Sequence, residues 1–233
     1  AQNPAYLELK DEGTDQQESD TYELWVAGKR VAKTNQSNVL DDGTVKFDPN
    51  TNTLTLSDAF LTLSGDAEEV IYCCTDSQWA EELTITGKAT LSDAVGIMTT
   101  GPLTLDNATL TLTGASDEAD GGVEDAFQAR DKEDISIQIS TVTIAGKSAG
   151  ENFFHFGIRC GNLTVANSTL DVKTNSGSAI AADELKVSGA GTVITLEQCT
   201  TAVECGATFN VAPGFCEAVV RPCLDHGVAV TPG

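Results

Sequence analysis

The chain has 233 residues, and this length does not by itself require two domains. Apolar residues make up 40% of it, enough for a continuous hydrophobic core, so the composition excludes an intrinsically disordered chain. The formal net charge of −22 repels phosphate backbones and anionic lipids, so we expect neither a nucleic-acid partner nor binding to a membrane surface.

The N-terminal part divides into a leader and a cap. Residues 1–20 predict a flexible acidic leader, because residues 7–20 hold six acidic side chains. Residues 21–53 predict an N-terminal β cap, in which the segments 22–26 and 31–33 flank a tight turn. No apolar run is long enough to span a bilayer, and the polar start shows no signal peptide, so we expect no membrane insertion and argue export from architecture alone.

A ten-residue pattern repeats through residues 54–214. Two short runs of alternating apolar residues surround one turn position in residues 54–63, 103–112, 135–144 and 163–172, and looser copies begin at Leu83, Leu185 and Phe209. The turn positions are Asp58, Gly87, Asn107, Ile139, Asn167, Gly189 and Pro213. All except Ile139 are residue types that favour sharp turns, so each copy predicts two strands around a corner.

A third apolar segment follows most copies, and three strands recurring every 20–32 residues are typical of a stacked repeat. We therefore predict an all-β, single-domain right-handed parallel β-helix (solenoid) of about seven irregular coils, with an N-terminal β-hairpin cap and a C-terminal cap and tail at 215–233. An antiparallel β-sandwich is the alternative. The copies predict one inward column of Leu54, Leu103, Ile135 and Leu163.

The third segments place small residues at one inward position: Cys73, Thr99, Ala129, Cys160, Ala182 and Cys205. We expect these side chains to be buried in the core. The seven cysteines show no zinc-ribbon spacing, and both one disulfide among the last cysteines and free thiols throughout remain open.

No constellation of catalytic residues is recognisable. His155 and His226 lie near no nucleophile in a familiar setting, and no strand presents two neighbouring outward carboxylates. The acidic stretch 117–122 lacks the spacing of a calcium loop. We therefore predict no catalytic residues, no metal site and no cofactor.

One ligand site is a candidate. Tyr72 and Trp79 offer stacking surfaces, and Arg130 and Arg159 are cations on neighbouring coils that suit a carboxylate or sulfate. The alternative is that both arginines pair with Asp131, Asp183 or Glu204 and bind nothing.

Residues 24–31 (LWVAGKRV), 42–49 (DGTVKFDP) and 52–56 (NTLTL) resemble a segment of uncharacterised gut-bacterial surface proteins with a pectin-lyase-like β-helix repeat domain. The resemblance covers residues 22–63 closely and implies export, surface display and a carbohydrate-binding or adhesive role, without catalytic residues.

We therefore expect a non-catalytic, secreted or cell-surface bacterial module, a monomer whose partners are glycans or host or bacterial surface components. The alternatives are a β-helix polysaccharide lyase or glycoside hydrolase, and a passive structural spacer.

Overall fold

A computed structural model describes residues 20–62, 69–73, 82–92, 95–113, 125–145, 156–174, 178–197, 208–211 and 231–232. Their regular structure consists of strands and a single turn of 3-10 helix, η1 (Arg130–Lys132). Among these residues, no helix has the length and apolar character needed to cross a membrane.

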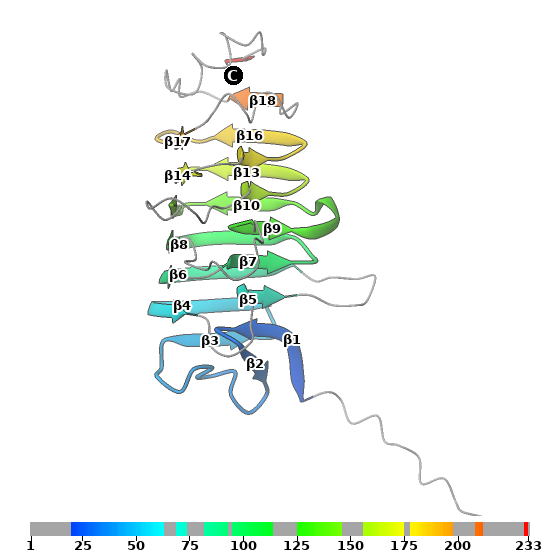
Figure 1. Cartoon of the computed structure of the whole chain (residues 1–233), viewed down its shortest axis with the longest axis vertical. Coiled ribbons are helices and arrows are strands. Elements are labelled where there is room, and N and C mark those ends of the chain that lie inside the picture. Colours follow the sequence, from blue (N-terminus) through cyan, green and yellow to red (C-terminus); the bar gives the residue numbers. More distant parts are fainter. Residues whose placement is uncertain are drawn as a thin grey trace, which may run out of the picture.

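The strands form two sheets that extend along the long axis of the molecule (Figure 1). The smaller sheet has the order β15 (Ser178–Ala181), β12 (Phe156–Arg159), β9 (Phe127–Ala129), β7 (Val95–Thr99), β5 (Glu69–Cys73), β1 (Thr21–Val26) and β2 (Lys29–Ala32). The larger sheet has the order β17 (Val193–Glu197), β14 (Thr169–Lys173), β11 (Thr141–Ala145), β8 (Leu103–Thr113), β10 (Ile135–Gln138), β13 (Asn162–Ala166), β16 (Glu184–Ser188), β18 (Thr208–Val211) and β19 (Thr231–Pro232). Three further strands extend this sheet from β8: β6 (Leu83–Ser92) pairs with β8, β4 (Thr53–Thr62) pairs with β6, and β3 (Val45–Asp48) pairs with β4.

The chain turns sharply at the predicted corner positions. Asn107, Ile139 and Asn167 have φ angles of 50°, 48° and 49°, and Gly87 and Gly189 both have 91°. These are left-handed conformations, so the corner prediction is confirmed there and at Asp58, while Pro213 lies outside the described residues.

Buried serines connect successive corners. The Ala108 amide donates to Ser140 Oγ at 3.0 Å, and the Ser140 amide donates to Ser168 Oγ at 3.0 Å. Both hydroxyls donate in turn to carbonyl groups two residues before them, so these buried polar atoms are satisfied within the stack.

The predicted inward column is confirmed in part. Ile135 pairs with Leu103 on one side and Leu163 on the other, and all three are buried. The predicted position of Leu54 in this column is wrong, because Leu54 pairs with Ile85 rather than with Leu83. The alignment assumed that Asp58 stacks on Gly87, whereas Gly87 lies against the backbone of Leu56.

The third strand of each repeat buries its small residues as predicted at four positions. Thr99, Ala129, Cys160 and Ala182 are buried and Cys73 is half-buried. Cys205 lies outside the described residues. Cys73 and Cys160 are free thiols.

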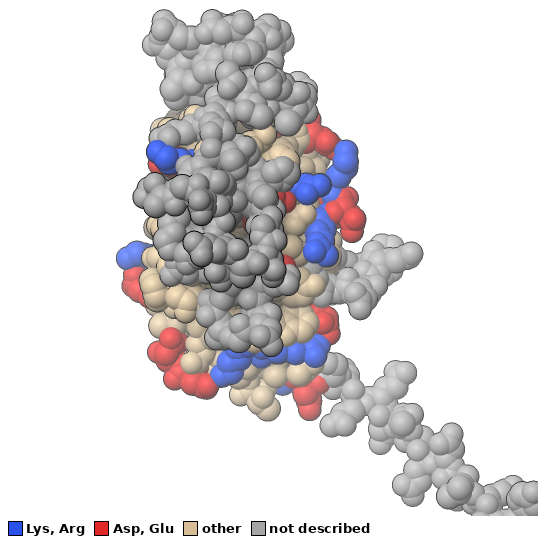
Figure 2. Space-filling model, viewed as in Figure 1, with Lys and Arg blue, Asp and Glu red and all other residues tan. Residues whose placement is uncertain are grey.

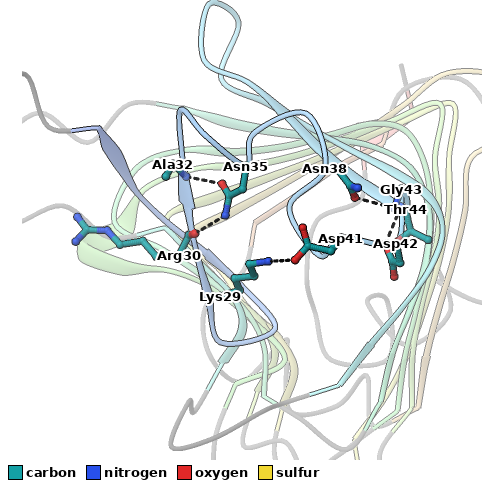
Figure 3. A network of polar contacts seen from close by, with 9 residues as sticks. All are labelled: Lys29, Arg30, Ala32, Asn35, Asn38, Asp41, Asp42, Gly43 and Thr44. Atoms are coloured by element: carbon teal, nitrogen blue, oxygen red, sulfur yellow. Dashed lines mark hydrogen bonds and ion pairs between the residues drawn. The ribbon is translucent and has the colours of Figure 1, made fainter.

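The N-terminal segment is held by side chains that bind backbone groups (Figure 3). Asn35 accepts from the Ala32 amide at 2.7 Å and donates to the Arg30 carbonyl at 3.0 Å. Further along, Asn38 accepts from the Gly43 amide, and an ion pair joins Lys29 to Asp41. The two asparagines thereby satisfy backbone groups of β2 and of the irregular segment that follows it.

The fold-class prediction of an all-β, single-domain right-handed parallel β-helix of about seven irregular coils requires correction. Both sheets mix parallel with antiparallel pairs, since β1 is antiparallel to β2 and β5, and β3 is antiparallel to β4. The strands β4, β6 and β8 also continue through their corners for ten or eleven residues, rather than forming two short strands each. A single left-handed residue kinks such a strand without ending its pairing.

Candidate functional site

The predicted ligand residues are only partly brought together. Tyr72 in β5 and Arg159 in β12 belong to one outward column of the smaller sheet, with Met98 and Gln128 between them. Three strand spacings separate them, about 14 Å. The Tyr72 ring packs on Trp25 with centroids 5.5 Å apart, and Trp79 lies outside the described residues.

Arg130 and Arg159 do line one concave site, with a volume of about 550 Å³. It opens where three successive repeats leave the smaller sheet, after β9, β12 and β15. Its lining is Gln128, Ala129, Arg130, Asp131, Lys132, Arg159, Cys160, Ala181, Ala182 and Asp183, which we call the three-turn pocket.

Backbone shape places these residues. Asp131 and Lys132 have φ angles of 55° and 65°, so the chain turns sharply at η1 and presents consecutive charged side chains. The next turn approaches closely, because a Cβ added to Gly161 would lie 1.9 Å from the Lys132 carbonyl oxygen. The Gly161 amide donates to the Glu133 carbonyl at 2.8 Å, and the Asp183 amide donates to the Gly161 carbonyl at 2.6 Å. Three turns therefore stack directly.

The three cations of the pocket have different partners. Lys132 Nζ contacts both oxygens of Asp183, at 2.9 and 3.2 Å. Arg159 Nη1 lies 3.6 Å from a carboxylate oxygen of the buried Asp125. No carboxylate of the described residues lies within ion-pair distance of Arg130.

The sequence analysis missed both Lys132 and Asp125 at this site. Lys132 follows Arg130 within the same turn, and Asp125 precedes β9 outside the repeat pattern. The predicted alternative partner Glu204 lies outside the described residues. Figure 2 shows basic and acidic side chains interleaved along the right-hand edge of the molecule, at the level of β9 to β16.

Cys160 forms part of the pocket floor and is 7% exposed. Burial raises the pKa of its thiol to about 12, and the nearby carboxylates of Asp134 and Asp183 act in the same direction. The thiol is therefore neutral at pH 7 and is a poor nucleophile. Within the described ranges, no group of three His, Cys, Asp or Glu side chains could hold a metal ion.

Comparison with known proteins points to an enzyme family. Residues 150–233 match the family model of KDPG and KHG aldolase. A 2-dehydro-3-deoxy-phosphogluconate aldolase of Treponema pallidum (strain Nichols) is 56% identical over 45 residues, which are 19% of this chain and 21% of that protein. The chain thus spans about a fifth of the length of the curated relative that it matches. No solved structure gives a significant match.

These findings overturn three predictions: the resemblance to pectin-lyase-like surface proteins, the single-domain β-helix assignment, and the function as a non-catalytic adhesion or carbohydrate-binding module. The resemblance rested on residues 22–63, a structural cap without reactive groups, whereas the family match begins at residue 150. The signal that was available is the stretch 215–233, which follows the last looser copy of the ten-residue pattern and which we interpreted as a C-terminal cap and tail.

Proposed function

We propose that the C-terminal segment, residues 150–233, serves an aldolase-type reaction on a phosphorylated 2-dehydro-3-deoxy sugar acid. The observation that carries this proposal is the 56% identity over 45 residues to the Treponema pallidum aldolase. The family match over residues 150–233 supports it independently of that single relative.

The pairing of the last two described strands also supports the proposal. Strands β18 and β19 are parallel neighbours, with Val211 opposite Pro232, and residues 212–230 connect them. Parallel neighbours need a crossover of about a dozen residues or more, which is the arrangement of β-crossover-β units in α/β enzymes. In such units ligands bind beyond the carboxyl ends of the strands, so we expect the substrate near Val211 and Pro232.

An aldol cleavage needs a group that accepts the electrons of the broken carbon–carbon bond, such as a lysine imine or a metal ion. Lys173 and Lys186 are the lysines of residues 150–233. Lys186 is a poor amine nucleophile, because its hydrogen bond and ion pair with Glu184, at 2.8 Å, raise the pKa of its ammonium group. Lys173, at the exposed end of β14, is the other lysine of this segment, and we propose it as the amine to test.

The test is pyruvate release from 2-dehydro-3-deoxy-6-phosphogluconate, followed by NADH consumption with lactate dehydrogenase. We expect a rate proportional to protein concentration, reduced by Lys173→Arg and unchanged by the matched Lys186→Arg. A rate equal to that of the protein-free solution would refute the proposal. Equal rates in the two variants would refute the role of Lys173 but not the aldolase proposal itself.

A further inference from the structure

We propose that the three-turn pocket binds the carboxylate of a small sugar acid, with the guanidinium groups of Arg130 and Arg159 as its anchors. This inference goes beyond the aldolase proposal, because Arg130 precedes the matched residues 150–233. It stands whether or not the chain cleaves a carbon–carbon bond.

The shape of the pocket suits a small molecule. Its volume of about 550 Å³ lies within the roughly 300–1,000 Å³ of small-molecule sites. The floor consists of the buried side chains of Ala129, Cys160 and Ala182, and charged side chains from three successive turns surround it. A ligand would therefore contact all three repeats at once.

Both arginines have N–H groups that can donate hydrogen bonds to a ligand. Arg130 has no ion-pair partner among the described residues. Arg159 Nη1 lies 3.6 Å from an oxygen of the buried Asp125, and its guanidinium lies 5.5 Å from the centroid of the Phe156 ring. Since 3.6 Å exceeds hydrogen-bond length, this contact leaves the N–H groups of Arg159 available. Lys132 is different, because Asp183 already occupies its ammonium group.

The chemistry of the lining favours a carboxylate with hydroxyl groups. A guanidinium presents a planar fork of donors that matches a carboxylate in a bidentate manner. Gln128, Asp131 and Asp183 add polar atoms that can bind sugar hydroxyls. The same two aspartates would repel a phosphate dianion more strongly than a carboxylate. On a chain of net charge −22, this cluster of cations is a local exception.

The test is isothermal titration calorimetry of the whole chain with gluconate at low salt. Sorbitol is the matched neutral ligand, since it carries a hydroxymethyl group in place of the carboxylate. Inorganic phosphate is the matched anion without a sugar chain. The protein variants are Arg130→Ala, the double variant Arg130→Ala/Arg159→Ala, and a charge-matched control, Lys46→Ala/Lys88→Ala, whose exposed lysines lie on β3 and β6.

We expect gluconate to bind wild type and the lysine control equally. Each arginine removed should weaken binding by about tenfold, the usual effect of losing a charged hydrogen-bonding partner. Binding of sorbitol as tightly as gluconate, tighter binding of phosphate, or no gluconate binding to wild type would each overturn the proposal. Equal affinity in wild type and in the Arg130→Ala variant, whose side chain is exposed, would overturn the assignment without depending on how the double variant folds.

Discussion

Replacing Gly161 with alanine tests whether the pocket depends on the close stacking of two turns. The added Cβ would lie 1.9 Å from the Lys132 carbonyl oxygen and 2.8 Å from its carbon, so the backbone must move. Overpacking of this kind costs about 1–3 kcal/mol, and we expect the upper end because the obstacle is backbone rather than a flexible side chain. The hydrogen bonds from Gly161 to Glu133 and from Asp183 to Gly161 would weaken with it.

The assay is urea denaturation monitored by circular dichroism, and the matched control is Gly43→Ala. A Cβ at Gly43 would meet nothing within 4 Å, but its φ of +78° makes alanine unfavourable by about 1–2 kcal/mol. We expect Gly161→Ala to lower the free energy of unfolding by more than Gly43→Ala does. A smaller or equal loss would refute the reasoning, because the two turns would then separate without cost.

Three further predictions concern the corners and the core. Ile139 is a β-branched residue with a φ of 48° and is 63% exposed. Its replacement by asparagine, the residue type at the equivalent corner 167, should raise the free energy of unfolding by about 1 kcal/mol. A lower thermal midpoint of the Ile139→Asn variant would contradict this. Ser140→Ala leaves the buried Ala108 amide without its acceptor and should cost about 1–3 kcal/mol in chemical denaturation, and an unchanged midpoint would show that the ladder is dispensable. The pKa of Cys160 in the folded chain, about 12, is above its ordinary value of 9.0. Between these two pH values the thiol ionises in the unfolded chain but not in the folded one. The thiol therefore leaves the free energy of unfolding independent of pH below 9 and lowers it as pH rises from 9 toward 12. A Cys160→Ala variant should lose less stability between pH 9 and 11 than wild type does, and identical pH profiles would contradict the burial of the thiol.

The positions of the corners could be predicted from the sequence because left-handed backbone selects a few residue types. Asn107 and Asn167 belong to those types, and Ile139 was found only through its place in the repeat. The register of β4 could not be predicted. An inward residue shifted by two positions is again inward, so the apolar alternation fits Leu54 against Leu83 as well as against Ile85.

Part of the candidate site, the two arginines, could be predicted from the sequence. Arg130 directly follows a recognisable third strand and Arg159 ends the next one, which placed them on neighbouring turns. The ion pairs of Lys132 and Arg159 were not predictable, because Lys132 lies in an irregular turn and Asp125 lies before a strand, where no periodicity fixes direction. The predicted domain boundaries, monomeric state and secretion or cell-surface location stay predictions.

The function could not be read from the repeat, because short strands with alternating apolar residues occur in several fold classes. Leu185 and Phe209 begin segments that fit the ten-residue pattern and also lie within the aldolase match. Periodicity reports which side chains face inward, whereas the chemistry of a site depends on a few residues that carry no periodic signal.

The most direct test of the aldolase proposal follows the bond that the reaction breaks. In 2-dehydro-3-deoxy-6-phosphogluconate labelled with carbon-13 at C3 and C4, nuclear magnetic resonance detects the coupling between these two carbons. The proposal predicts that the coupling disappears on incubation with the whole chain, while the label at C3 appears in the methyl group of pyruvate and the label at C4 in glyceraldehyde 3-phosphate. If the coupling were lost no faster with the protein than in protein-free solution, the result would contradict the proposal.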